Sequence, residues 1–306
     1  MGKIAFVFPG QGAQYSGLGK QLYENSVAAR AVFDMADSIR PGTSKQCFEG
    51  TPEELAVTEN TQPCLYCVEL AAAAALTAAG IKPAMVAGFS LGELAALAFS
   101  GAMSYEDAFR LVCRRAEHMH RAAQGSDAAM AAVLKLDDET VTQLCGEFPN
   151  VYPVNFNSPG QVVVAGESGS MDAFKALVTQ AGGKAMMLKV SGGFHSPFMA
   201  SAFAAFLTEL EQFDLKKPII PVYANVTAQP YAGDMKRLLA EQIVNPVRWQ
   251  TAVENMMKDG ADTFVEVGPG KVLSGLIKRI SGTVRVLNVE NAESLESTAA
   301  EVREDA

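Results

Sequence analysis

The sequence predicts an α/β protein with a large domain, built on a parallel sheet, and a smaller subdomain inserted into it. Over the first 125 residues, apolar stretches of strand length alternate with helical patterns, which is typical of parallel strands connected by helices. After Gly125 the order becomes strand, helix, strand, strand, helix, strand, and after residue 191 the first pattern returns. We therefore expect residues 1–125 and 192–306 to form the large domain and residues 126–191 the small subdomain.

The first part of the large domain begins with the apolar stretch KIAFVF, residues 3–8, which predicts a buried strand ended by Pro9-Gly10. A second, shorter strand is expected over residues 84–87. Helical periodicity predicts helices over residues 17–38, 63–79 and 104–123, and one that runs to about residue 99. Ser104 is a typical N-cap residue for the helix that it begins.

The inserted segment is expected to contain four strands and two helices. The strands are predicted over residues 130–136, 152–155, 161–165 and 184–190, and the helices over residues 137–148 and 170–180. A turn cluster, Asn157-Ser158-Pro159-Gly160, separates the second strand from the third. The resulting β-α-β-β-α-β order is that of the ferredoxin-like motif.

The last part of the chain returns to alternation of helices and strands. Helices are predicted over residues 199–213 and 231–243, and strands over residues 221–225 and 263–267. The last strand runs into Gly268-Pro269-Gly270 and a further helix. The acidic segment of residues 293–306 is expected to be a helix that frays or a loose tail.

Composition and charge argue against several classes of protein. The 306 residues are 49% apolar and 19% charged, which is ordinary for a soluble globular protein, and no run of about 20 apolar residues is available to span a membrane. The net charge of −9 argues against binding to nucleic acid. The apolar segment near the first residue is too short for a signal peptide, so we expect a cytoplasmic protein.

The cysteines and histidines form no pattern that predicts a metal or redox site. The only C-x-x-C pair, Cys64 and Cys67, lies in a predicted helix with no strand before it, which favours a role in helix packing. His118 and His120 are two residues apart on another helix and therefore point to different sides. We expect no metal and no bound cofactor, and His195 remains as the histidine to explain.

A serine between two glycines, in the stretch GFSLGE, is the main candidate for catalysis. Ser90 follows an apolar strand and precedes an alanine-rich helix. In a Gly-x-Ser-x-Gly nucleophile elbow, a sharp turn of this kind exposes the hydroxyl group. The five-residue pattern alone also fits a loop serine between flexible residues. With an elbow at this point, the large domain is expected to be α/β-hydrolase-like.

A serine nucleophile needs a base and an oxyanion hole. His195 is the candidate base, because it follows a strand and two glycines and precedes Ser196-Pro197, a junction from which an imidazole can project into a cleft. A lone histidine in a loop is otherwise often structural. The candidate oxyanion donors are the backbone N–H of Leu91 and a donor from the loop FPGQGAQ, in which Gln11 carries an amide.

Together these motifs resemble those of the malonyl-CoA:acyl carrier protein transacylases, the acyltransferases of bacterial fatty-acid synthesis. The likeness extends from Phe6 to about Ile280 and is much more specific than any single motif, because the motifs occur in the order of the family. They are FPGQGAQ, GFSLGE, LVCRRAEHM, NFNSPGQVVVAG, GGFHSPFM, NPVRW and EVGPGKVL.

The resemblance implies a role for each matching position. Ser90 would be the nucleophile that becomes malonylated, and His195 would be its base, so that the two form a Ser-His dyad. Gln11 and the backbone of Leu91 would form the oxyanion hole. Arg115, in LVCRRAEHM, would bind the malonyl carboxylate.

Three further positions complete the implied site. Phe194 and Asn157 would contact substrate, and a phenylalanine before the base is similar to malonyl-selective rather than methylmalonyl-selective enzymes. A backbone carbonyl around Arg248 would orient His195 in place of an aspartate. Two positions depart from the family pattern: Phe89 stands where a histidine usually precedes the nucleophile, and Arg248 stands where Gln or a similar residue usually precedes the tryptophan.

The reaction implied by the resemblance is that of an [acyl-carrier-protein] S-malonyltransferase in fatty acid biosynthesis and lipid metabolism. A malonyl group would move from malonyl-CoA, through an ester on Ser90, to the phosphopantetheine thiol of holo acyl carrier protein.

A trans-acting malonyl acyltransferase that loads a polyketide synthase fits the same motifs. Other classes remain as alternatives: a serine esterase or thioesterase, which would not need Arg115, and a non-catalytic module that binds carrier protein. The expected partners are malonyl-CoA and acyl carrier protein, and we expect a monomer.

Overall fold

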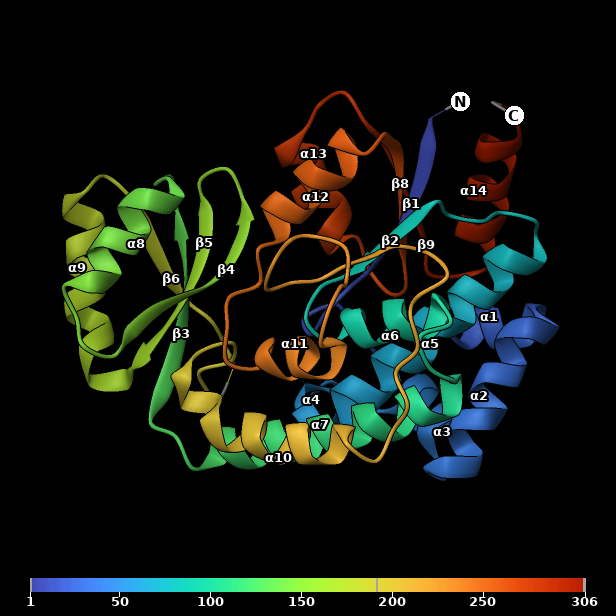
Figure 1. The fold of residues 1–306 in the computed structure, drawn as a ribbon, viewed down its shortest axis with the longest axis horizontal. Helices are drawn as coiled ribbons and strands as arrows, with labels where there is room; N and C mark the ends of the chain where they lie inside the picture. The colour runs from blue at the N-terminus through green and yellow to red at the C-terminus, as the bar shows by residue number, and fades with distance from the viewer. Residues whose placement is uncertain (1, 191, 305–306) are drawn as a thin grey trace.

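The computed structural model describes residues 2–190 and 192–304 and contains two sheets of different type (Figure 1). The larger sheet has five parallel strands in the order β7-β2-β1-β8-β9, and the smaller has four antiparallel strands in the order β4-β5-β3-β6. In Figure 1 the smaller sheet forms a green lobe beside the larger body. The predicted α/β class is therefore confirmed. The limits of the small subdomain stay a prediction, and residue 191 lies outside the described residues.

The parallel sheet is buried on both faces. Its strands are β1 (Lys3–Phe8), β2 (Met85–Gly88), β7 (Val222–Tyr223), β8 (Ala261–Val267) and β9 (Arg285–Val289). Alternate residues of β1 pack into two separate apolar clusters: Phe6 and Phe8 belong to one, and Ala5 and Val7 to the other. Burial on both faces explains why the strand reads as a continuous apolar run in the sequence.

The carboxyl ends of the central strands meet at one edge of this sheet. The register pairs Phe8 of β1 with Gly88 of β2, and Ala87 of β2 with Tyr223 of β7. The loop after β1, the turn after β2 and the segment after β7 therefore leave the sheet side by side. Ligands of open parallel sheets bind beyond this edge.

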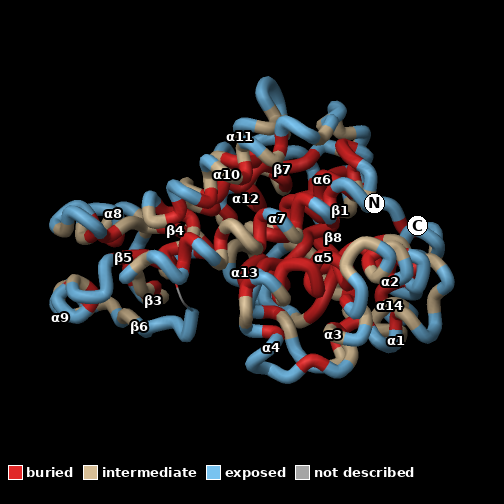
Figure 2. The backbone as a smooth tube through the Cα atoms, turned by 90° about the horizontal axis from the view of Figure 1, so that it is seen from below, coloured by how far each residue is buried: buried red, intermediate tan, exposed pale blue. Residues whose placement is uncertain are grey.

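Seven α-helices of the described residues precede the small sheet and make up much of the large body. They are α1 (Lys20–Asn25), α2 (Val27–Ile39), α3 (Thr43–Glu49), α4 (Pro52–Ala56), α5 (Thr58–Ala78), α6 (Gly92–Phe99) and α7 (Tyr105–Gln124). Figure 2 shows that buried residues gather in α5 and in the central strands, whereas the outer helices alternate between buried and exposed positions.

The predicted helices differ most from those observed in the first part of the chain. The helix expected over residues 17–38 is divided into α1 and α2 at Ser26, whose side chain accepts the N–H of Ala29 and so begins a new helix. The helix expected from Pro63 begins at Thr58, and the proline lies within it. The sequence analysis made no prediction for the residues that form helices α3 and α4.

The small sheet carries its two helices in the predicted order β-α-β-β-α-β. Its elements are β3 (Ala128–Leu134), α8 (Asp138–Gly146), β4 (Val151–Ser158), β5 (Gln161–Glu167), α9 (Met171–Gln180) and β6 (Lys184–Met187). β6 ends three residues before the prediction, at Met187, which is the last residue paired with β3. The small sheet is tied to the large body at Val247, whose N–H donates to Val154 and whose carbonyl accepts from Phe156.

Five α-helices follow the small sheet in the part of the chain that the structure describes. They are α10 (Ala200–Leu210), α11 (Met235–Glu241), α12 (Trp249–Lys258), α13 (Val272–Ile280) and α14 (Ala292–Glu304). The sequence analysis missed α12 and the edge strand β9. The predicted C-terminal segment forms α14, and residues 305–306 lie outside the described residues. Across the described chain, no helix combines the length and the apolar character needed to cross a membrane.

Candidate active site

Ser90 occupies a sharp turn between β2 and α6. Its φ is +54°, in the left-handed region that residues other than glycine rarely adopt. The flanking glycines allow this turn: a Cβ on Gly88 would lie 1.9 Å from the carbonyl carbon of Gly92, and a Cβ on Gly92 would lie 2.2 Å from the carbonyl oxygen of Phe8. Strand, turn and helix together have the arrangement of a nucleophile elbow.

His195 lies against the Ser90 hydroxyl group. Its Nε2 is 2.7 Å from Ser90 Oγ, and its Nδ1 is 2.7 Å from the backbone carbonyl oxygen of Gln242. Because a carbonyl only accepts hydrogen bonds, Nδ1 must carry the proton, and Nε2 is free to accept the Ser90 O–H. Burial, together with the charge of Arg115, lowers the pKa of His195 to about 4. The imidazole is therefore neutral at pH 7, as a general base must be.

The carbonyl that orients His195 belongs to Gln242, so the prediction of a carbonyl around Arg248 is wrong. Gln242 directly follows α11, and carbonyl groups at the end of a helix lack a partner within it. The carbonyl of Arg248 is already used, because it accepts the N–H of Ala252 at the start of α12.

The candidate oxyanion donors lie beside Ser90. The loop after β1 approaches the elbow so closely that a Cβ on Gly10 would be 2.7 Å from the carbonyl oxygen of Phe89. The side-chain amide of Gln11, which the sequence suggested as a donor, is engaged elsewhere: its Nε2 lies 3.5 Å from Thr58 Oγ1, and its Oε1 accepts from Gln62. No hydrogen bond within residues 2–190 and 192–304 uses the backbone N–H of Gln11 or of Leu91. Unpaired N–H groups next to a nucleophile are the donors that a developing oxyanion requires.

Arg115 reaches the nucleophile from α7. Its Nη2 is 3.2 Å from Ser90 Oγ, and two neutral amide oxygens hold the guanidinium: Gln62 Oε1 lies 2.8 Å from Nη1, and Gln242 Oε1 lies 2.7 Å from Nη2. The side chain is fully buried, and this burial lowers its pKa to about 10, so it remains charged at pH 7. No carboxylate of the described chain forms an ion pair with it. A buried cation of this kind can bind an anionic group of a ligand.

A buried carboxyl group, Glu93 of α6, lies next to this cation. It accepts hydrogen bonds from Gln242 Nε2 at 2.7 Å, from the backbone N–H of Asn225 at 3.3 Å and from the hydroxyl of Tyr231. Burial raises the pKa of Glu93 to about 7, although these hydrogen bonds and the charge of Arg115 oppose the rise. The polar groups around the nucleophile therefore form one connected network.

The polar residues of this network that the sequence analysis missed include Gln62, Asn225 and Gln242. All three side chains are buried. Gln62 carried a signal, because a glutamine among the apolar residues of a buried helix needs a polar partner. Asn225 lay at the end of a predicted strand, where functional side chains of parallel sheets gather. Gln242 carried no local signal, since it stands in an ordinary helical pattern.

A cavity of about 610 Å³ opens at the dyad, a volume suited to a small-molecule ligand. It lies between the large body and the small sheet, because both contribute to its wall. The lining residues are Gln11, Gly12, Gln14, Ala56, Thr58, Phe89, Ser90, Met119, Met130, Asn155, Leu188, Lys189, Val190, Phe194 and His195. Phe194 is among these residues, and its contact with substrate stays a prediction.

Asn155 lines this cavity, whereas Asn157, the substrate contact implied by the sequence, does not. Irregularities in the pairing of β4 lie between Pro153 and Asn155 and between Phe156 and Ser158. Bulges of this kind change which side chains share a face of a strand. The implied contact at Asn157 is therefore corrected: a molecule bound at Ser90 would meet Asn155.

Phe89, the departure from the family pattern before the nucleophile, is fixed by packing. Its ring centroid is 5.6 Å from that of Trp249, in the motif NPVRW. Its side chain lines the cavity and supplies apolar surface there instead of a hydrogen-bonding group.

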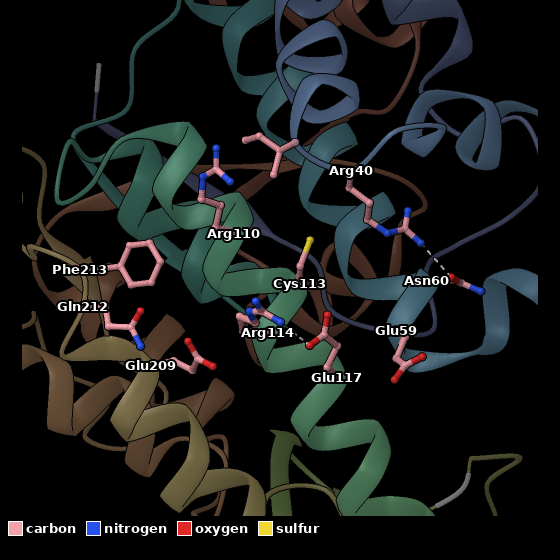
Figure 3. Close-up of a pocket in the computed structure, with 11 residues that line it drawn as sticks. Arg40, Glu59, Asn60, Arg110, Cys113, Arg114, Glu117, Glu209, Gln212 and Phe213 are labelled. Carbon is pink, nitrogen blue, oxygen red and sulfur yellow. Dashed lines mark hydrogen bonds and ion pairs between the residues drawn. The ribbon is translucent and has the colours of Figure 1, made fainter.

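A second cavity, of about 490 Å³, lies on another face of α7 (Figure 3). Cys113 and Arg114 line it, together with Arg40 and Glu209, but neither member of the dyad does. Arg114 is exposed there and pairs with Glu117 at 3.0 Å. Of the two adjacent arginines, only Arg115 therefore faces the nucleophile.

Comparisons with known sequences agree with this geometry. The family model described as acyl transferase domain matches residues 5–304. The malonyl CoA-acyl carrier protein transacylase of Bacillus subtilis (strain 168) is 38% identical over 313 residues, which cover 100% of this chain and 99% of that protein. The transacylase of the same description from Synechocystis sp. is 37% identical and covers 96% of this chain and 99% of its own.

Solved structures agree as well. The malonyl CoA-acyl carrier protein transacylase from Clostridium perfringens matches with a TM-score of 0.96 and 36% identity, over 99% of this chain and 98% of that one. A chain of a second solved structure also matches, with a TM-score of 0.94 and 34% identity, over 98% of this chain and 99% of that one. That structure is described as a type II PKS acyl-carrier protein in complex with its malonyl-transacylase. The chain therefore belongs to the acyl transferase domain family, as its motifs predicted, and is similar over its whole length to malonyl CoA-acyl carrier protein transacylases.

Proposed function

We propose that this protein transfers a malonyl group from malonyl-CoA to the phosphopantetheine thiol of acyl carrier protein through an ester on Ser90. The observation that carries the proposal is the buried Arg115 guanidinium, which lies 3.2 Å from the Ser90 hydroxyl and forms an ion pair with no carboxylate of the described residues. A simple esterase does not need a cation there, whereas a malonyl thioester brings a carboxylate that a planar guanidinium can hold. Full-length similarity to malonyl CoA-acyl carrier protein transacylases supports the same substrate.

In the first half of the reaction, His195 Nε2 takes the proton of Ser90 as Oγ bonds to the thioester carbonyl carbon. The backbone N–H groups of Gln11 and Leu91 stabilise the oxyanion that forms. The carbon–sulfur bond then breaks, His195 gives its proton to the CoA sulfur, and a malonyl ester remains on Ser90. The carbonyl of Gln242 keeps the imidazole in the required tautomer throughout.

The second half runs in reverse with a new thiol. The phosphopantetheine thiol gives its proton to His195 as its sulfur attacks the ester carbonyl. The bond to Ser90 Oγ breaks, and the hydroxyl recovers its proton from the imidazole. Both halves use the same base and the same oxyanion donors, so one site is sufficient for the whole transfer.

This sequence of steps predicts ping-pong kinetics. Initial rates with varied malonyl-CoA, at several fixed concentrations of holo acyl carrier protein, should give parallel double-reciprocal lines. Intersecting lines would show that both substrates bind before transfer and would contradict an ester intermediate. Rapid release of free malonate without carrier protein would identify a thioesterase instead.

The pH profile should follow the neutral form of His195. Because the pKa of the buried imidazole is about 4, the base stays unprotonated as the pH falls from 7 to about 5. We expect kcat/KM for malonyl-CoA to change little over this interval and to decline only at lower pH, in rapid assays at constant ionic strength. A decline centred on the ordinary histidine value of 6.5 would show that burial does not protect the imidazole.

Docking of acyl carrier protein is expected to use local basic residues, because carrier proteins are acidic and this chain has a net charge of −9. Lys189 lines the cavity, and Lys278 and Arg279 are exposed at the end of α13. Reversal of Lys278 and Arg279 to glutamate should raise KM for the carrier protein several-fold and leave KM for malonyl-CoA almost unchanged. The control reverses Lys20 and Lys45, which are exposed on α1 and α3. Equal changes for both substrates would contradict the docking role.

A polyketide carrier is the second candidate acceptor. It is favoured by the match to a type II PKS acyl-carrier protein in complex with its malonyl-transacylase. Values of kcat/KM for fatty-acid and polyketide holo carrier proteins, measured with the same malonyl-CoA, decide between the two. Sedimentation of the purified protein tests the expected monomer.

A further inference from the structure

Asn225 is buried behind the nucleophile and has no part in the steps above. It follows β7, whose pairing with β2 brings the segment after it beside the turn that carries Ser90. Its side-chain Oδ1 accepts the backbone N–H of Ser90 at 2.7 Å, and its Nδ2 donates to the carbonyl of Gly88 at 2.6 Å. One amide group therefore binds both the last residue of the strand and the nucleophile.

These two hydrogen bonds act on a strained backbone. Ser90 has φ of +54°, and a residue with a side chain keeps such a conformation only where its surroundings enforce it. The N–H of Ser90 lies between β2 and α6, so neither element provides its acceptor. Asn225 supplies that acceptor, and a buried N–H without one would be unfavourable.

Gln242 holds the other backbone group of Ser90. Its Nε2 donates to the Ser90 carbonyl oxygen at 2.7 Å and lies 3.4 Å from Asn225 Oδ1. The N–H and the C=O of the nucleophile are thus both fixed by side chains from the segment after the small sheet. The hydroxyl remains for chemistry, 2.7 Å from His195 Nε2 and 3.2 Å from Arg115 Nη2.

We propose that Asn225 is a positioning residue for acyl transfer, because its side-chain amide fixes the backbone conformation that places Ser90 Oγ between His195 and Arg115. The inference rests on the proposed function in that it takes Ser90 to be acylated. Without this amide, φ of Ser90 is free to relax, and a displacement of about 1 Å at the reacting atoms can cost roughly 100-fold in rate. Asn225 does not line the cavity, so binding of malonyl-CoA should be retained.

The test compares Asn225→Ala with the wild type and with Asn255→Ala. Asn255 is a matched control, because its side chain also donates to the carbonyl of a residue with positive φ, Ala228, at 2.9 Å. Single-turnover experiments with radiolabelled malonyl-CoA give the rate constant of acylation. The final amount of protein-bound label gives the number of sites that are able to react. Asn225→Ala should acylate about 100-fold more slowly per competent site, with half-saturation by malonyl-CoA unchanged. Asn255→Ala should acylate at the wild-type rate.

Asn225→Asp distinguishes positioning of Ser90 from a general contribution to folding, because its acylation rate should depend on the protonation of the introduced carboxyl group. A neutral carboxyl group can make both hydrogen bonds, since one oxygen accepts the N–H of Ser90 and the O–H donates to the carbonyl of Gly88. An ionised carboxylate keeps the acceptor and loses the donor. The acylation rate of Asn225→Asp should therefore recover when the introduced carboxyl group is protonated.

The pH dependence of this variant is measured against that of the wild type, because other groups titrate nearby. Glu93 accepts the backbone N–H at this position and binds Tyr231, while Arg115 and His195 both bind Gln242. Burial and the adjacent Glu93 should raise the pKa of the introduced carboxyl group. The acylation rate relative to the wild type should therefore rise as the pH falls from about 8 to about 5.

Two results would overturn the proposal: wild-type acylation per competent site in Asn225→Ala, or a rate of Asn225→Asp relative to the wild type that does not depend on pH. If Asn225→Ala does not fold, Asn225→Asp decides alone, because its two protonation states are compared within one folded protein. Absence of label on the wild-type enzyme would contradict the proposed function instead, so the two failures are distinguishable.

Discussion

Replacement of Ser90 by alanine is expected to abolish malonyl transfer and the covalent adduct together. Ser90 Oγ is 2.7 Å from the base and 3.2 Å from the Arg115 guanidinium. Among the described residues that line the cavity beside His195, only Thr58 carries another hydroxyl group. Removal of the nucleophile from a serine enzyme lowers kcat by about 10⁶-fold. Intact mass after mixing with malonyl-CoA should show a gain of about 86 Da in the wild type, as expected for a malonyl ester, and none in Ser90→Ala.

Two controls make this result specific to Ser90. Ser201→Ala removes an exposed hydroxyl group from α10 and should leave both the adduct and the transfer rate unchanged. Thr58→Val removes the other hydroxyl that the described residues place in the cavity and should leave the adduct in place. An adduct that persists in Ser90→Ala and disappears in Thr58→Val would show that the nucleophile has been assigned to the wrong residue.

Replacement of Arg115 by alanine is expected to reduce malonyl transfer by roughly 30- to several-thousand-fold, since loss of a charge-assisted pair in a buried site costs about 2–5 kcal/mol. Acetyl transfer from acetyl-CoA should be spared, because acetyl has no carboxylate for the guanidinium to bind. The measurement is the ratio of kcat/KM for malonyl-CoA to that for acetyl-CoA. Arg114→Ala should leave this ratio unchanged, because Arg114 is exposed and pairs with Glu117.

Because Arg115 is buried, a second substitution is needed to separate loss of carboxylate binding from loss of stability. The guanidinium holds Gln62 and Gln242, so alanine can also lower the thermal stability of the fold. Arg115→Lys keeps the charge and loses the planar pair of donors, and it should lower malonyl transfer at a melting temperature closer to that of the wild type. Equal losses with malonyl-CoA and acetyl-CoA in both variants would mean that Arg115 supports the site without binding the carboxylate.

Local patterns in the sequence determined the fold class and singled out Ser90 as the candidate nucleophile. The strand expected over residues 3–8 coincides with β1, because an apolar run ended by Pro-Gly specifies a buried strand without reference to the rest of the chain. The β-α-β-β-α-β order was likewise readable from turns and periodicity. Ser90 stood out because an elbow needs glycines at fixed positions on either side of the nucleophile.

Where the elements begin and end was less well determined. The division between α1 and α2 depends on one capping side chain, Ser26, and the start of α5 at Thr58 overrides the usual preference for proline in the first turn. The first outcome is a local capping effect that the periodic pattern does not contain. The second reflects burial of α5 against its neighbours.

Only the tertiary structure decided which groups surround Ser90. Asn225 and Gln242 stand 135 and 152 residues away along the chain and reach it because β7 pairs with β2 and α11 ends beside the elbow. The motif NPVRW suggested that a carbonyl around Arg248 orients His195. The carbonyl that does so belongs to Gln242, because α11 ends there and leaves this group without a partner in the helix. The choice of Asn155 over Asn157 depends on irregular pairing in β4. Turns and strands follow from chemistry between near neighbours, whereas partners so distant in sequence are set by the order of the strands and by how the helices pack on them.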